Sequence, residues 1–386
     1  NYPYVSVVTD PADYGNIVEE MKNSGGSVSA KTNFELARNA FSLTARYDAA
    51  ISNHLQGIDV EEGEFPLTYT VQYERKQIMR YGENPHQKAA FYNDLSINQP
   101  SISTAEQLWG KELSYNNIMD SDAALDLIME FKNPACVILK HSNPCGAAQS
   151  ESMLADAYKS AFAVDSTSAF GGIVGLNRPL DAETAQAISE VFTEVVIAPD
   201  YTQEALDILT KKKNIRLLKV PEISQGAAAK KQLLFTRRVT GGLLLQDRDL
   251  GEVDLDQAKV VTDRKPTPDE MEALKFAWKI VKYVKSNAIV YANKDQILGV
   301  GAGQMSRVDS SKIAIMKAGN AALSLKGSVI ASDAFFPFRD GVDEAAKAGA
   351  TAVVQPGGSV RDQEVIDAAN EHNMAMIFTG MRHFRH

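Results

Sequence analysis

The last sixty residues alternate between short apolar runs and amphipathic segments, and this alternation limits the possible folds strongly. The runs at 328–332, 351–355 and 374–379 have the length and composition of buried strands. The segments at 343–349 and 362–373 have helical spacing. Strands that are joined by helices pair in parallel, with the helices covering the sheet. The chain is therefore predicted to be an α/β protein.

The same alternation extends back through most of the chain. The apolar run ACVILK at 135–140 is predicted to be a strand buried on both faces. Two regions follow one plan, in which a strand leads into a polar loop with a proline (141–146 and 333–340) and then into a helix. This shared plan predicts two similar α/β halves, at about 73–260 and 261–386.

The front of the chain follows the plan less completely. It predicts a strand at 5–10, a helix at 11–26 and a second helix opened by a capping box at Thr32. An acidic stretch with glycines and a proline then predicts a linker at 58–72. One strand and two helices cannot enclose a core, so we expect 1–57 to be the back end of a domain whose front lies upstream.

Composition narrows the class of protein. A net charge of −9 disfavours sequence-independent binding to nucleic acid, which depends on clustered Lys and Arg. No apolar run approaches the length of a membrane span, so no membrane contact is expected. The two cysteines, Cys136 and Cys145, argue for a reducing compartment, and the start at Asn1 has no visible targeting signal. We expect a cytoplasmic protein.

The stretch LKHSNPCG at 139–146 holds the most reactive side chains. A zinc site is disfavoured because Cys145 has no second cysteine at the usual spacing. A helix N-terminus or a neighbouring cation could activate Cys145 as a nucleophile, but a small packed residue is at least as good an interpretation. Lys140 and His141 could act together at the sheet edge, or could be an ordinary lysine and a hydrogen-bonded histidine.

Three further polar stretches shift the balance towards a ligand site. RYGENPHQ at 80–87 has more polar side chains that can bind a ligand than a simple turn needs. SDAFFPFRDG at 332–341 sets three phenylalanines beside charged residues, which suits a flat aromatic ligand. RHFRH at 382–386 is a phosphate site if it is fixed and a frayed end if it is not. GVGAGQMSR at 299–307 matches a dinucleotide fingerprint only weakly.

Eight stretches in order resemble the bifunctional purine-biosynthesis family that combines AICAR transformylase with IMP cyclohydrolase. They are RYGENPHQ, LSYNNIMDSDAALDL, LKHSNPCGAA, SAFGGIVGLNRPLD, GGLLLQDRD, KSNAIVYANKDQILGVGAGQMSR, SDAFFPFRDGVDEAAKAG and MRHFRH. The resemblance covers 73–386 as the transformylase domain and 1–57 as the last part of the cyclohydrolase domain.

The resemblance implies transfer of the formyl group of 10-formyltetrahydrofolate to the 5-amino group of AICAR, which gives FAICAR. That amine is a weak nucleophile because its lone pair is delocalised into the imidazole ring. By matched position, His141 would take its proton, and Lys140 would stabilise developing oxyanion charge or protonate the departing folate nitrogen.

The resemblance also implies a set of binding residues. Those for AICAR are Arg80, Tyr81, His86, Asn117, Phe170, Gly171, Glu194, Asn287, Phe335, Arg382 and Phe384. Those on the folate side are Arg307 and Asp340. Arg382 is the candidate phosphate ligand.

The family further implies two linked cytidine-deaminase-like α/β units without zinc, a homodimer with sites at the interface, and a potassium ion near the C-terminus. Its cyclohydrolase residues would precede Asn1, so this chain is expected to carry formyl transfer without a complete cyclohydrolase site. The rival interpretations are a zinc-dependent deaminase-like hydrolase and a non-catalytic dimerisation partner.

Overall fold

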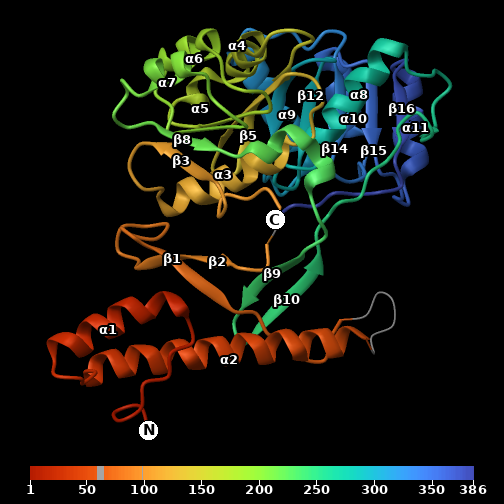
Figure 1. Cartoon of the computed structure of the whole chain (residues 1–386). Coiled ribbons are helices and arrows are strands. Elements are labelled where there is room, and N and C mark those ends of the chain that lie inside the picture. The colour runs from red at the N-terminus through yellow and green to blue at the C-terminus, as the bar shows by residue number, and fades with distance from the viewer. Residues whose placement is uncertain (59–64, 98) are drawn as a thin grey trace. The chain divides into compact units, whose positions relative to one another are not determined.

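The computed structural model describes residues 1–58, 65–97 and 99–386. Its contacts divide the chain into two compact units, Asn1–Ile78 with Ala90–Ile97, and Met79–Ala89 with Asn98–His386 (Figure 1). Among the helices in these ranges, none is long and apolar enough to cross a membrane.

The first large sheet has six strands in the order β3-β8-β7-β6-β4-β5. The strands β6, β7 and β8 pair in parallel, and the other neighbours pair antiparallel. The bounds are β3 Glu106–Trp109, β4 Ala135–Lys140, β5 Asn143–Gln149, β6 Ile173–Leu176, β7 Val195–Ala198 and β8 Arg216–Lys219.

The second large sheet also has six strands, in the order β11-β16-β15-β14-β12-β13. Here β14, β15 and β16 are parallel, as the sequence predicted, and the remaining pairs are antiparallel. The bounds are β11 Lys259–Val260, β12 Ile289–Ala292, β13 Ile297–Gly301, β14 Val329–Ser332, β15 Ala352–Gln355 and β16 Ala375–Phe378.

The two sheets repeat one topology strand by strand. In both, the first strand lies at one edge beside the last, and the second and third form a hairpin at the other edge. The predicted pair of similar α/β halves is confirmed at this level, but the predicted correspondence between them is wrong. The sequence matched β4 with β14, whereas the topology matches β4 with β12 and β6 with β14, because both halves open with an edge strand and a helix.

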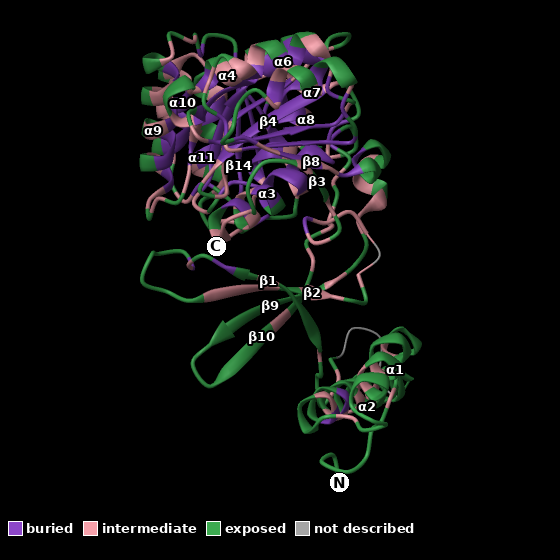
Figure 2. Cartoon of the chain, turned by 60° about the vertical axis from the view of Figure 1, so that its left-hand side comes forward, coloured by how far each residue is buried: buried purple, intermediate pink, exposed green. Residues whose placement is uncertain are grey.

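Helices form three layers around the two sheets. A central core combines α3 and α8 with strands of both sheets, and two outer cores lie on the opposite faces of the sheets. Figure 2 shows the buried strands of this unit and the more exposed helices around them. Along β4, alternate side chains enter the central core (Val137, Leu139) and the outer core (Cys136, Ile138). The helices of this unit are α3 Tyr115–Ile128, α4 Leu154–Val164, α5 Ser166–Ala169, α6 Ala182–Ser189, α7 Gln203–Leu209, α8 Pro268–Val281, α9 Arg307–Asn320, α10 Asp340–Ala348, α11 Asp362–Glu371 and the 3₁₀ segment η2 Pro221–Ala229.

Two helix starts are built as the sequence predicted. The Asp181 side chain accepts a hydrogen bond from Thr184 N at the start of α6. Thr267 and Glu270 form a reciprocal capping box at the start of α8, with Pro268 in the first turn. These caps satisfy amide groups that have no partner within the helix, so local sequence alone specifies them.

The loop predicted after β4 is wrong. A two-residue turn at His141 and Ser142 follows β4, and 143–149 forms β5 instead of a loop leading into a helix. Pro144 is tolerated there because β5 lies at the edge of its sheet, where a missing N–H removes little pairing.

A second hairpin is formed by β9 (Leu234–Val239) and β10 (Gly242–Asp247). Among the described residues, β9 and β10 pair only with each other, as a two-stranded sheet. All of its residues except Leu245 are exposed, including the apolar side chains of Phe235, Leu243 and Leu244.

The smaller unit contains η1 (Pro11–Asp13), α1 (Tyr14–Asn23), α2 (Ala30–Ile58) and most of the hairpin of β1 (Tyr73–Met79) and β2 (Ala89–Asp94).

Two predictions for this unit are wrong. The strand predicted at 5–10 has no regular structure, because its backbone pairs with no strand among the described residues. The second helix begins at Ala30 instead of Thr32, since the Ser29 hydroxyl accepts from Thr32 N at 3.2 Å and caps it earlier. Much of the predicted linker, 59–64, lies outside the described residues.

Candidate functional site

Lys140 and His141 lie where the buried strand β4 reaches the sheet edge. Residues 135–139 of β4 are fully buried, Lys140 is half-buried and His141 is exposed. The Lys140 Nζ donates to the main-chain oxygen of Phe170 at 2.7 Å, and an ammonium group has further donors available. A donor and a proton acceptor therefore stand next to each other at an open edge.

The turn that presents His141 has an unusual backbone. His141 and Ser142 have φ values of 53° and 58°, in the left-handed region that non-glycine residues seldom adopt. Such a conformation destabilises the chain by roughly 1–3 kcal/mol per residue unless its surroundings hold it.

Asp120 on α3 holds this turn, and sequence reasoning missed it. One carboxylate oxygen accepts from His141 N at 3.1 Å, and the other accepts from Ser142 N at 2.7 Å and from Ser142 Oγ at 3.1 Å. The only sequence signal was its position three residues after Asn117, on the same helix face.

The structure brings several predicted AICAR-binding residues together beside Lys140. The Asn117 side chain donates to Glu194 Oε2 at 2.5 Å. Glu194 N donates to Gly172 O at 3.1 Å, and Gly171 N donates to Phe192 O at 2.7 Å. The loop that carries Phe170 and Gly171 is thus tied both to the Glu194 segment and, through the Phe170 oxygen, to Lys140.

A second group gathers around Asn287. The Asn287 Oδ1 accepts from Arg307 Nη2 at 2.8 Å, and Arg307 also donates to Ser332 Oγ at 2.8 Å and pairs with Asp333. Asp333 is fully buried, and Arg307 is 7% exposed. The Arg307 guanidinium orients the Asn287 side chain in this structure. The contact predicted between Arg307 and the folate stays a prediction.

Asn143 connects the two groups. Its side chain accepts from Lys285 N at 3.0 Å and donates to His141 O at 3.2 Å. A cavity of about 250 Å³ opens beside it, lined by residues of both halves, including Lys140, His141 and Lys317. The ion pair between Lys317 and Asp165, at 2.8 Å, joins the halves at the cavity wall.

The C-terminal stretch is fixed, which rules out the frayed interpretation. His383 is 1% exposed. Its ring Nδ1 contacts Asp249 Oδ2 at 2.6 Å, and its backbone N–H donates to the main-chain oxygen of Asp333 at 3.0 Å. On either side of it, the exposed side chains of Arg382 and Phe384 lie together, with the guanidinium carbon 4.6 Å from the ring centroid.

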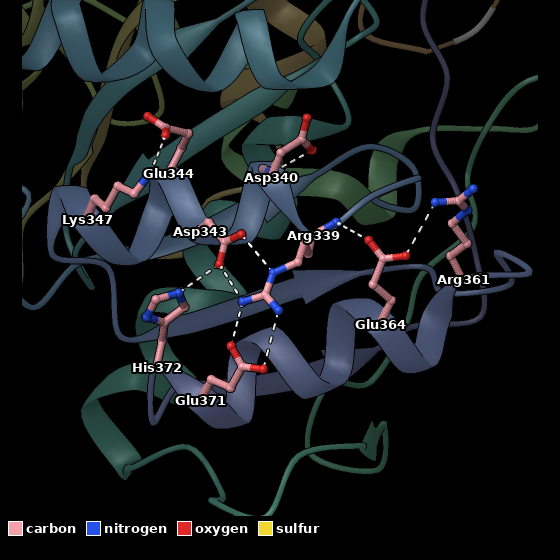
Figure 3. Close-up of polar contacts among 10 residues, drawn as sticks. Arg339, Asp340, Asp343, Glu344, Lys347, Arg361, Glu364, Glu371 and His372 are labelled. Atoms are coloured by element: carbon pink, nitrogen blue, oxygen red, sulfur yellow. Dashed lines mark hydrogen bonds and ion pairs between the residues drawn. The ribbon is translucent and has the colours of Figure 1, made fainter.

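Phe335 and Asp340 follow β14 and lead into α10. Phe335 is 37% exposed, and Asp340 is the first residue of α10. The start of the helix is anchored by Arg339, whose guanidinium contacts Asp343 at 2.9 Å and Glu371 of α11 at 2.6 Å (Figure 3). Asp340 is exposed, and the contacts of the neighbouring Arg339 hold the helix start on which it lies.

Three predicted residues stand apart. Arg80 and His86 are exposed and Tyr81 is half-buried in the loop between β1 and β2. Arg80 lies 5.6 Å from the Tyr81 ring centroid. Within the described ranges, no hydrogen bond or ion pair joins these three side chains to the other predicted site residues.

The surroundings of Cys145 argue against the thiol interpretation. Burial, followed by the nearby Asp165 carboxylate, raises the pKa of Cys145 to about 12, and its Sγ donates to Ile138 O at 3.4 Å. Such a thiol is protonated at neutral pH and is a poor nucleophile. Among the described residues, no group of three or more His, Cys, Asp or Glu side chains is arranged to hold a metal ion.

The sequence of the chain is similar to known proteins. The sequence model of the AICARFT/IMPCHase bienzyme family matches residues 1–317. The bifunctional purine biosynthesis protein PurH of Magnetococcus marinus is 56% identical over 396 aligned positions. That alignment covers 100% of this chain and 74% of the relative.

Proposed function

The chain belongs to the AICARFT/IMPCHase bienzyme family, and we infer from this that it is an AICAR formyltransferase of purine biosynthesis. It transfers a formyl group from 10-formyltetrahydrofolate, its cosubstrate, to AICAR. The observation that carries this inference is the sequence match, which spans the whole chain at 56% identity.

We propose that His141 and Lys140 perform the proton chemistry. The AICAR amine must lose a proton as it attacks the formyl carbon, and an exposed imidazole at the sheet edge can accept that proton. Negative charge then develops on the formyl oxygen, where the Lys140 ammonium group, oriented by the Phe170 oxygen, stabilises it. The bond from the formyl carbon to the folate nitrogen then breaks, and that nitrogen takes up a proton, which Lys140 can supply, to give FAICAR and tetrahydrofolate. The contact between Lys140 and the Phe170 oxygen supports a fixed position for the ammonium group.

The test is a formyl-transfer assay on the chain with AICAR and 10-formyltetrahydrofolate. We expect His141→Ala to lower kcat by about 10²–10⁴-fold, the usual contribution of general acid–base catalysis. His54→Ala, on the exposed face of α2, is the matched control and should keep wild-type activity. Equal rates for wild type and His141→Ala would refute the assigned base.

We propose two binding regions around this pair. Around AICAR we assign Asn117, Phe170, Gly171, Glu194, Asn287 and Phe335, with Arg80, Tyr81 and His86 from the loop after β1 and with Arg382 and Phe384 from the C-terminus. The stacked, exposed Arg382 suits a phosphate, because its planar guanidinium can bind two oxygens at once. On the folate side we assign Asp340 and Arg307. Raised KM values for AICAR or for the folate in single alanine variants test these assignments.

We propose a homodimer, and the exposed hairpin of β9 and β10 supports it. A two-stranded sheet alone in water is only marginally stable, and this one exposes Phe235, Leu243 and Leu244. A second copy that covers the hairpin would bury these side chains. Light scattering should give twice the chain mass of 42.1 kDa, and a single-chain mass would overturn the proposal.

We propose that potassium binds near the C-terminal stretch. The Ser286 hydroxyl and the buried Asp333 carboxylate lie beside this stretch and offer oxygen atoms, the ligands that alkali cations prefer. Both groups are already hydrogen-bonded within the chain, so the ion would add to an existing structure. A higher melting temperature in potassium chloride than in choline chloride of equal ionic strength tests this.

We propose that 73–386 form the transformylase domain and that 1–57 belong to the cyclohydrolase domain, with 58–72 as the linker. Formyl transfer by a fragment that starts at residue 73 tests this division.

The free thiols of Cys136 and Cys145 support a reducing, cytoplasmic location, which cell fractionation can check.

A further inference from the structure

The turn that carries the proposed base has the wrong residues for its conformation. Two-residue hairpin turns with positive φ at both positions favour Asn-Gly or related pairs. Here the positions are occupied by His141 and Ser142, while Lys140 and Asn143 form the closing pair of the hairpin. Something outside the hairpin must therefore stabilise the turn.

The Asp120 carboxylate meets this requirement with both of its oxygens. Each oxygen accepts one of the two turn amides, and one of them also accepts the Ser142 hydroxyl. Only a carboxylate offers two acceptors in this arrangement. An amide side chain would turn one donor towards a backbone N–H, which is itself a donor.

The helix that carries Asp120 is itself fixed at the site. Asn117 lies three residues earlier in α3, on the same helix face, and donates to Glu194. Ser114 and Asn117 also form a reciprocal capping box at the start of α3. One helix therefore contacts both Glu194, which we assign to AICAR binding, and the turn that carries His141.

We propose that Asp120 is a positioning residue for formyl transfer, which sets the His141–Ser142 turn so that the imidazole meets the AICAR amine. It acts through the backbone of the turn and touches no reacting atom. This inference rests on the proposed function of Lys140 and His141.

The central test is Asp120→Asn, assayed for formyl transfer with AICAR and 10-formyltetrahydrofolate. We expect kcat to fall about 10- to 100-fold, because a displaced catalytic group loses much of its effect. The KM for AICAR should change less than about threefold, since the Asn117–Glu194 contact is retained. A purely structural role would instead lower the amount of folded enzyme and leave kcat per folded chain unchanged.

Two variants sharpen the test. Ser142→Ala removes only the hydroxyl contact and leaves both amide contacts, so its loss in kcat should be smaller than that of Asp120→Asn. Asp156→Asn makes the same chemical change on the exposed face of α4 and should leave kcat unchanged.

The outcomes separate this inference from the proposed function. An inactive wild-type chain refutes the function itself. An active wild type together with a fully active Asp120→Asn refutes the role of Asp120 alone. A loss in kcat that is fully matched by a loss of folded protein in thermal melting also refutes it. Reduced kcat in well-folded Asp120→Asn, with the KM for AICAR preserved, supports it.

Discussion

Cys145 shows at the residue scale how surroundings decide reactivity. It lies five residues after Lys140 in a stretch that looks nucleophilic, yet its thiol is packed and donates to the Ile138 oxygen. Burial favours the neutral form, so the pKa is raised to about 12. The side chain therefore acts as a small apolar residue.

We predict that Cys145→Ala keeps kcat for formyl transfer within about threefold of wild type, because a protonated thiol takes no part in the proton chemistry. A thiol-directed alkylating agent at pH 7 should likewise leave activity intact over the time in which a free model thiol reacts completely. Rapid inactivation that Cys145→Ala abolishes would contradict this interpretation.

Single residues also show what could be predicted. Lys140 and His141 were candidates from their position after a buried run, since residue order along a strand determines which side chains reach its end. Asp120 was not a candidate, because its contacts are with residues 21 and 22 positions away. Pairings over that distance depend on how α3 packs on β4, which no local pattern specifies.

At the scale of elements, α10 and α11 are joined by a charge network. Arg339 contacts Asp343 on its own helix and Glu371 on α11, and His372 contacts Asp343 at 2.8 Å (Figure 3). The hydrogen bond from Arg339, with smaller help from His372, holds the pKa of Asp343 below its usual value of 3.8. Arg339 therefore stabilises the pair of helices whenever Asp343 is ionised.

We predict that Arg339→Met lowers the melting temperature by a few degrees at pH 7 and low salt. A depressed carboxyl pKa contributes stability above the unfolded value of 3.8, and this contribution is lost as pH falls through the folded pKa. The difference between variant and wild type should therefore shrink below about pH 4 and also at high salt.

Arg361→Met is the comparison variant, because Arg361 makes a longer ion pair, at 3.5 Å with Glu364, and its guanidinium lies 4.8 Å from the Phe338 ring centroid. Its effect should be smaller at every pH. Equal effects of the two variants in thermal melts would show that the Arg339 network adds no specific stability.

At the scale of the whole molecule, the larger unit shares one central core. Phe131 and Phe276 come from different halves, and their ring centroids lie 5.6 Å apart in the central core. The hydroxyl of Tyr283, from the second half, accepts a hydrogen bond at 2.8 Å from Lys230 of the first half, which is also paired with Glu130, so this contact joins the halves as well. The two halves are therefore expected to unfold together.

The chain has two tryptophans, and one lies in each half: Trp109 in β3 and Trp278 in α8. We predict that Trp109→Phe and Trp278→Phe, each leaving one reporter, give coincident urea transitions by fluorescence. Adding Phe276→Ala should lower the free energy of unfolding by about 3–5 kcal/mol and shift both reporters equally.

Val360→Ala, at a fully exposed side chain, should leave both transitions in place. Separate midpoints for Trp109 and Trp278, or a shift of only one reporter in the Phe276→Ala background, would show that the halves unfold independently.

The sequence by itself determined the α/β class, the parallel strands near the C-terminus, and the caps of α6 and α8. These features depend on periodicity and on contacts within a few residues. Tertiary structure alone decided that 143–149 is an edge strand, that β4 corresponds to β12, and that Asp120 holds the turn at His141 and Ser142. Those features depend on which distant segments pack together, and the free energy of that packing outweighs local preference.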